Sequence, residues 1–204
     1  MKYIITITII ILILLSLNKN EEKTMTLTKN STILAFGDSI TDGFSASKEE
    51  SYPYLLSKLT DLQVINAGVN GDTSADGLKR LSKLLEDTSI KLMILCFGGN
   101  DIIRKKPLSE LKSNLKTIIQ KAKAKNIDVL LISVPNISLF GLSPLKLYEE
   151  VADEEDIYLL SGLIADILSQ PSLKSDHIHP NALGYKKMAD EIYEALKKNR
   201  LLTD

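Results

Sequence analysis

The chain has 204 residues, 44% of them hydrophobic and 25% charged, a balance typical of one globular domain and not of a disordered or collagen-like chain. Its 25 basic and 26 acidic residues nearly cancel, so no overall positive charge favours nucleic acid as a partner. A single cysteine, Cys96, excludes an internal disulfide and a cysteine-based zinc site, and two histidines are too few for a multi-histidine metal site.

Residues 1–30 differ in character from the rest of the chain. Lys2 precedes a charge-free run rich in isoleucine and leucine at residues 3–17, and a polar segment follows. A positive start, an apolar stretch of about 15 residues and a polar exit are typical of an export signal. The run is short for a spanning helix, which needs about 20 residues, and no small-residue cleavage pattern occurs near Ser16.

We therefore expect residues 1–30 to form a cleaved signal peptide or an uncleaved membrane anchor with a polar linker. Either alternative implies export to the periplasm or cell envelope, and the anchor implies membrane contact through residues 3–17. A buried element of the domain is the third alternative for this run. Residues 31–204 are expected to form one domain.

From residue 31 onward, short apolar runs alternate with amphipathic helical patterns. Five runs are typical of buried strands, at residues 32–36, 63–66, 91–97, 128–132 and 157–159. Apolar residues at helical spacing occur over residues 78–85, 108–122 and 185–196. This alternation predicts an α/β fold with a mostly parallel sheet and helices on both faces.

In such folds, functional residues lie on loops at the carboxyl ends of the strands. Ser39 follows the first strand where a helix should begin, so its hydroxyl and N–H can both face a cleft, although helix capping is the commoner role. Gly68 follows the second strand and permits either close backbone approach to a ligand or a simple turn. Asn100 follows the third strand and offers either an amide donor or an Asx turn.

The loop before the last helix contains the groups that a nucleophilic serine needs. Asp176 lies three residues before His179. A serine nucleophile requires a base, and the base requires an acceptor that fixes its tautomer, so these two side chains can supply both. A solvated loop with an aspartate or asparagine helix cap is the alternative, and a metal pair of His177 and His179 lacks a third ligand.

Together and in order, these segments resemble the sequence blocks of the GDSL, or SGNH, family of serine esterases and lipases. The blocks read Gly37-Asp38-Ser39-Ile40, with isoleucine for the leucine of the family name, then Gly68, Gly98-Gly99-Asn100-Asp101 and Asp176-His177-Ile178-His179. The resemblance covers residues 31–198 and is closest to the acyl-CoA thioesterase I, lysophospholipase L1 and arylesterase branch. It implies a three-layer α/β/α sandwich of the flavodoxin-like SGNH architecture.

The resemblance also implies a hydrolase of small-molecule esters or thioesters that works through an acyl-enzyme on Ser39, without a metal or organic cofactor. His179 would act as the base and Asp176 would hold it, while the N–H groups of Ser39 and Gly68 and the amide of Asn100 would form the oxyanion hole. The G-x-S-x-G pattern of α/β-hydrolases is absent around Ser39.

Two other functions stay open at this point. An acetylesterase that acts on cell-envelope carbohydrate would use the same catalytic residues. A non-catalytic envelope-binding protein is disfavoured, because a retired site would be expected to lack at least one of these residues.

The loop at residues 135–145 is apolar, whereas surface loops are usually polar. Its apolar side chains either wall an acyl groove beside Ser39 or cover the core; they are Ile137, Leu139, Phe140 and Leu142. Three further polar residues are expected to lie outside the chemistry. Asp38 would brace the turn behind Ser39, Asp101 would cap the helix that follows or support Asn100, and His177 would face solvent.

Overall fold

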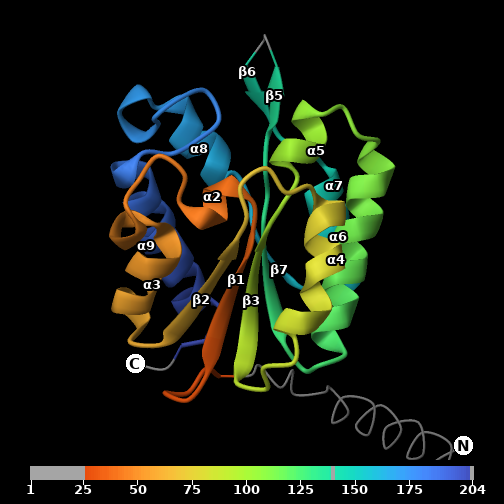
Figure 1. The fold of residues 1–204 in the computed structure, drawn as a ribbon, viewed down its shortest axis with the longest axis vertical. Coiled ribbons are helices and arrows are strands. Elements are labelled where there is room, and N and C mark those ends of the chain that lie inside the picture. Colours follow the sequence, from red (N-terminus) through yellow and green to blue (C-terminus); the bar gives the residue numbers. More distant parts are fainter. Residues whose placement is uncertain (1–25, 139–140, 203–204) are drawn as a thin grey trace, which may run out of the picture.

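The computed structural model of the chain describes residues 26–138 and 141–202. Its centre is a five-stranded parallel sheet with the strand order β2-β1-β3-β4-β7 (Figure 1). The strands are β1 (Thr32–Gly37), β2 (Gln63–Gly68), β3 (Ile90–Cys96), β4 (Asp128–Ile132) and β7 (Tyr158–Leu160). All five predicted strands are thus confirmed, and their order is the flavodoxin-like one.

Helices cover both faces of this sheet, which makes the expected three layers (Figure 1). On one face α3 and α8 pack against α9, and on the other α6 packs against α4 and α7. The helices are α2 (Ser39–Asp42), α3 (Tyr52–Thr60), α4 (Ser74–Leu84), α5 (Gly99–Ile103), α6 (Leu108–Lys123), α7 (Leu147–Glu155), α8 (Leu163–Ser169) and α9 (Ala182–Lys198), with 3₁₀ turns η1 (Lys48–Glu50) and η2 (Pro171–Leu173).

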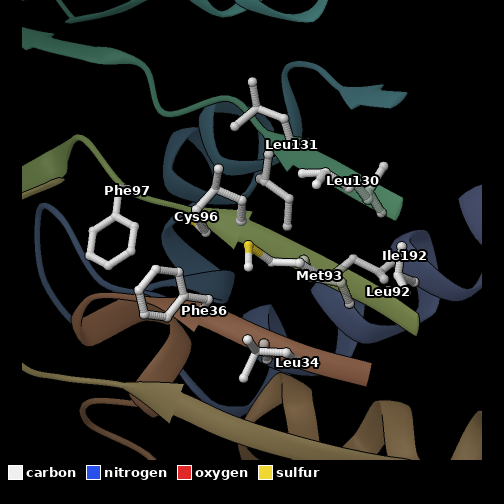
Figure 2. Packing of buried hydrophobic residues seen from close by; sticks show 14 of the residues in the cluster. Leu34, Phe36, Leu92, Met93, Cys96, Phe97, Leu130, Leu131 and Ile192 are labelled. Carbon is white, nitrogen blue, oxygen red and sulfur yellow. The ribbon is translucent and has the colours of Figure 1, made fainter. Parts of the chain in front are cut away.

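The core lies on both sides of the central strands. Every residue of β1 is buried, whereas in β2 at the edge of the sheet only Ala67 is buried and the other residues are partly or fully exposed. A central parallel strand is covered by helices on both faces and therefore needs a continuous apolar run, as the sequence has here. Figure 2 shows Phe36 of β1 beside Phe97, and the two rings meet edge to face with centroids 5.1 Å apart. Cys96 is fully buried in this layer, and burial raises the pKa of its thiol well above the ordinary value.

The domain begins earlier in the chain than the sequence pattern indicated. Leu27 is buried in the core, its N–H donates to the carbonyl oxygen of Leu201 over 2.8 Å, and it forms a parallel bridge with Leu202. The expected boundary at residue 30 is therefore too late, because an isolated leucine in a polar stretch gives no periodic signal. The apolar run at residues 3–17 lies outside the described residues.

The apolar loop at residues 135–145 forms a two-stranded antiparallel hairpin of β5 (Asn136–Ser138) and β6 (Gly141–Ser143). It projects beyond the carboxyl end of the sheet, past α5 and α8 (Figure 1). Within residues 26–138 and 141–202, no helix combines the length and the apolar character needed to cross a membrane.

Candidate active site

A cavity of about 220 Å³ opens at the carboxyl end of the sheet. Six separate segments of the chain meet there, and three of them bring Ser39, Asn100 and His179 to its wall. Most of the other lining residues are apolar: Ile40, Phe44, Ile103, Val134, Ile164, Leu168 and Ile178. The residues that the sequence singled out at positions 39, 100 and 179 thus share one cavity.

Three of these side chains form a continuous line of contacts. The Oγ of Ser39 lies 3.0 Å from Nε2 of His179, and Nδ1 of His179 lies 2.8 Å from Oδ2 of Asp176. When Nδ1–H donates to the carboxylate, Nε2 is left with a lone pair that can accept the serine hydroxyl proton. Ser39 is the first residue of α2, so the turn after β1 holds its hydroxyl at the cavity.

Asp176 also holds the backbone of its own loop. Its Oδ1 accepts hydrogen bonds from the N–H groups of Ile178 and His179 over 2.7 and 2.8 Å. Partial burial opposes ionisation of this carboxyl, but the hydrogen bonds from the His179 side chain and the two N–H groups lower its pKa below the ordinary value. The carboxylate therefore stays charged beside the imidazole. His177, two residues before His179, is exposed as expected.

An aromatic ring packs against the imidazole of His179. The centroids of the Phe44 and His179 rings lie 4.5 Å apart, at an interplanar angle of 41°. The backbone carbonyl oxygen of Phe44 accepts a hydrogen bond from the hydroxyl of Tyr185 over 2.9 Å. These contacts hold His179 against rotation away from Ser39. Sequence reasoning missed Phe44, because a lone aromatic residue in a loop carries no motif.

Asn100 lies on α5 with its amide turned toward the same cavity. Its Nδ2 donates to the carbonyl oxygen of Asp72 over 3.1 Å and lies 3.5 Å from Oδ2 of Asp38. An amide nitrogen carries two hydrogens. The hydrogen bond to Asp72 fixes the orientation of the Asn100 amide, whereas the longer contact of 3.5 Å with Asp38 is a weak hydrogen bond. The amide is thus a pre-oriented donor.

The structure does not bring Gly68 to the cavity as expected. Its N–H donates to Oδ1 of Asn66 over 3.0 Å, and a Cβ at Gly68 would lie 2.1 Å from the backbone nitrogen of Asp42. Gly68 is therefore a packing glycine, which lets the end of β2 approach α2. Gly71 lines the cavity instead, with φ at +82°, and within the described residues its N–H donates to no protein acceptor. The sequence signal for Gly71 was the turn Asn70-Gly71-Asp72, which any surface loop can contain.

Arg80 connects the loop of Gly71 to the end of β1. Its Nε donates to Oδ2 of Asp72 over 2.8 Å, and its guanidinium also donates to the carbonyl oxygen of Gly37 over 3.0 Å. The guanidinium stacks 4.6 Å from the centroid of Phe36. One cation therefore fixes the backbone next to Ser39 and the peptide that orients Asn100. Helical periodicity could not reveal this role.

Two aspartates near the catalytic residues are buried, Asp38 at the wall of the cavity and Asp101 next to Asn100 in the chain. Oδ1 of Asp38 accepts from the N–H of Ile40 over 3.1 Å, so Asp38 caps α2 and braces the turn as expected. Burial raises its pKa to about 7. Asp101 caps α4 and not the helix that follows it, because its carboxylate accepts from the N–H and hydroxyl of Ser74 over 2.9 and 2.7 Å.

Of the four residues expected to wall an acyl groove, Leu142 lines a different cavity, together with Pro144, Leu145 and Ser161. Among the described residues, Val134 alone borders both cavities. Leu139, Phe140 and the side chain of Ile137 lie outside what the structure describes. The apolar wall near Ser39 is built from residues of α5, α8 and the loops around them. Because these segments are separate in the sequence, no single one of them predicts the wall.

No group of three or more His, Cys, Asp or Glu side chains able to hold a metal ion occurs in residues 26–138 and 141–202. The contacts described above are all between protein groups.

Residues 35–187 of the sequence match the family described as "GDSL-like Lipase/Acylhydrolase family". The chain is 31% identical over 180 residues to Esterase TesA of Pseudomonas aeruginosa, an alignment that covers 81% of this chain and 88% of the relative. It is 30% identical over 173 residues to Thioesterase 1/protease 1/lysophospholipase L1 of Escherichia coli, with 81% and 83% of the two chains covered. A solved esterase, EstA from Pseudoalteromonas sp. inhibited by monoethylphosphonate, superposes with a TM-score of 0.75 at 26% identity, over 82% of this chain and 97% of the other.

Proposed function

Because the chain belongs to the GDSL-like lipase/acylhydrolase family and is an ester hydrolase of that family, we propose that it cleaves acyl esters and thioesters through an acyl-enzyme on Ser39. The observation that supports this proposal most directly is the contact line from Ser39 through His179 to Asp176, with distances of 3.0 and 2.8 Å. A nucleophile in contact with a base, and that base in contact with an orienting carboxylate, is the arrangement that covalent acyl transfer requires.

In the proposed mechanism, Oγ of Ser39 attacks the carbonyl carbon while Nε2 of His179 accepts the hydroxyl proton. The C–O or C–S bond to the leaving group then breaks, and His179 returns the proton to the departing alcohol or thiol. Water repeats the sequence on the acyl-enzyme and releases the carboxylic acid and free Ser39. Asp176 stays ionised throughout and stabilises the imidazolium that forms in each step.

The oxyanion would be bound by three donors at the cavity, the N–H groups of Ser39 and Gly71 and the Nδ2 of Asn100. Gly71 replaces Gly68 in this role because only Gly71 lines the cavity with its N–H unused by other described residues. Each such donor is typically worth about 3–4 kcal/mol in the transition state.

The substrate is proposed to carry an apolar acyl chain. Ile103, Val134 and Ile164 contribute to a mainly apolar wall beside Ser39, which suits a hydrocarbon better than a sugar hydroxyl. This wall favours acyl hydrolysis over deacetylation of envelope carbohydrate. Export by residues 1–30 remains a further proposal, supported by the charge-free run at residues 3–17.

A series of p-nitrophenyl esters from acetyl to palmitoyl tests the proposal with the full chain. We expect hydrolysis with a maximum above acetyl, stoichiometric labelling by a phosphonate, and loss of both in Ser39→Ala, whose melting temperature should stay close to that of the wild type. Phosphonate labelling of Ser39→Ala would reject Ser39 as the nucleophile. A maximum at acetyl would instead support the carbohydrate acetylesterase.

A further inference from the structure

The segment between α5 and α6 is exposed and lies at the edge of the cavity. Residues 103–109 are all exposed, and Ile103 at the start of this segment also lines the cavity. The guanidinium of Arg104 donates to the carbonyl oxygen of Gly71 over 2.7 Å, which fixes the segment to the cavity wall. Figure 1 shows α5 and the start of α6 at the same end of the molecule as α2.

Large apolar side chains concentrate at this end of the molecule. Seven large hydrophobic residues are exposed in the described part of the chain: Phe44, Tyr54, Leu59, Val69, Ile103, Leu108 and Leu183. Four of them belong to segments at or next to the cavity, namely Phe44, Val69, Ile103 and Leu108, whereas Tyr54 and Leu59 lie on α3 and Leu183 lies on α9. Phe44 and Ile103, which are 42% and 50% exposed, form the lip of the cavity. Clustered apolar exposure of this kind marks an interaction site and not an ordinary surface.

The charge within the segment is positive and unpaired. Lys105 and Lys106 lie between the exposed Ile103 and Leu108, and neither ammonium forms an ion pair with any carboxylate among the described residues. Three carboxyls at or near the cavity are already engaged: Asp38, which lines it, accepts from the N–H of Ile40, while Asp72 pairs with Arg80 and Asp176 with His179.

From these observations we propose that the rim formed by Phe44, Val69 and residues 103–108 docks on an anionic lipid surface, with apolar side chains in the acyl–headgroup boundary and Lys105 and Lys106 on lipid phosphates. Apolar groups beside unpaired cations are the combination that such an interface binds. The inference rests on the proposed function, because docking would place the cavity where amphiphilic acyl esters are concentrated.

The chain contains no tryptophan, so single substitutions provide local reporters of lipid contact. We would introduce Leu108→Trp at the rim and Leu59→Trp on α3 as a matched control, since these leucines are 46% and 40% exposed. Each full-length variant is mixed with vesicles of brominated phosphatidylcholine and phosphatidylglycerol. Residues 3–17 are identical in both variants, so a difference in fluorescence quenching reports on the rim.

We expect strong quenching for Leu108→Trp and little for Leu59→Trp. Adding Lys105→Gln and Lys106→Gln to the rim reporter should weaken docking by about 30-fold, and high salt should act in the same direction. Val69→Trp serves as a second reporter on the rim if Leu108→Trp fails to fold, since Val69 is also exposed.

Equal quenching at the rim and on α3, or none at the rim, would overturn the proposal. A fluorescence change that depends on protein concentration without lipid would also overturn it, in favour of a second copy of the chain. Hydrolysis of soluble p-nitrophenyl acetate by the same variants keeps the proposed function separate: an active chain without quenching would refute docking alone, and an inactive wild type would count against the hydrolase mechanism.

Discussion

The loop at residues 175–181 and the loop at residues 69–73 both line the cavity, but they contribute in different ways. The first presents Asp176 and His179, whose side chains have chemistry that can be recognised in a sequence. The second presents a backbone N–H at Gly71, and the nearby Gly68 looks equivalent in the sequence while it serves only packing. The comparison teaches that side-chain groups reveal a site early, whereas backbone donors depend on conformation.

The largest expected effect on kcat comes from a substitution in the loop at residues 175–181. Asp176→Asn should lower kcat by about 10⁴-fold, because an amide at this position favours the wrong imidazole tautomer and cannot stabilise the imidazolium. His177→Asn on the same loop is the matched control and should leave kcat unchanged, since His177 is exposed. Steady-state kinetics on a p-nitrophenyl ester measures kcat for both variants. Equal losses of kcat would show that Asp176 only maintains the conformation of the loop and does not orient His179.

The next effect tests whether Asn100 acts as a donor or only supports a turn. Asn100→Ala should lower kcat by about 10²–10³-fold with little change in KM, because the amide matters mainly in the transition state. Asn100→Asp should be at least as damaging, since it places negative charge against the developing oxyanion. A turn role predicts that aspartate preserves activity. Kinetics and melting temperatures of both variants separate the two roles, and full activity in Asn100→Asp would exclude the donor.

A smaller effect on kcat should distinguish Gly71 from Gly68 as the backbone donor to the oxyanion. Gly71→Ala strains a residue with φ at +82° by about 1–2 kcal/mol and should turn its N–H away, lowering kcat by about tenfold. Asn66→Ala releases the N–H of Gly68 instead, and should lower the melting temperature while kcat stays near the wild-type value. The opposite pattern in kcat would restore Gly68 as the oxyanion donor.

The last prediction concerns Asp38, which is buried at the wall of the cavity. Its substitution should change activity least but should change stability measurably. Its pKa is raised from 3.8 to about 7 by burial, so the folded state retains a proton that the unfolded chain loses. The stability gained from this proton is fully present below pH 4 and is lost as the pH rises to about 7. Asp38→Asn keeps the acceptor for Ile40 and should become more stable than the wild type as the pH rises through this window. Thermal melts at several pH values measure this, and parallel curves for the two proteins would contradict the assignment.

The fold was largely predictable from the sequence because parallel strands buried on both faces leave continuous apolar runs, as in residues 91–97. The nucleophile, the base and its orienting carboxylate were predictable for a similar reason, since Ser39, Asp176 and His179 occur at element boundaries in a fixed order. Their mutual distances, however, required the fold.

Three features could not be predicted, each for a physical reason. Gly68 and Gly71 differ only in backbone conformation and neighbours, which no residue type encodes. Arg80 acts through a carboxylate and a carbonyl that lie 8 and 43 positions away in the chain. Leu27 joins the core by pairing with the far end of the chain, a contact that local periodicity does not record.

The pairing of Leu27 with Leu202 also has a consequence for how the protein can be fused to a partner or immobilised. The segment before β1 and the segment after α9, which this bridge joins, lie at the amino-terminal end of the sheet (Figure 1), whereas the cavity opens at the carboxyl end. A fusion partner or a solid support joined beyond either residue would therefore stand at the opposite pole from the cavity mouth. Because Leu27 donates its N–H to Leu201, the neighbour of Leu202, the two ends of the described chain lie side by side. A short linker between them could therefore close the described chain into a circular permutant, with new ends opened in a surface loop far from the catalytic residues.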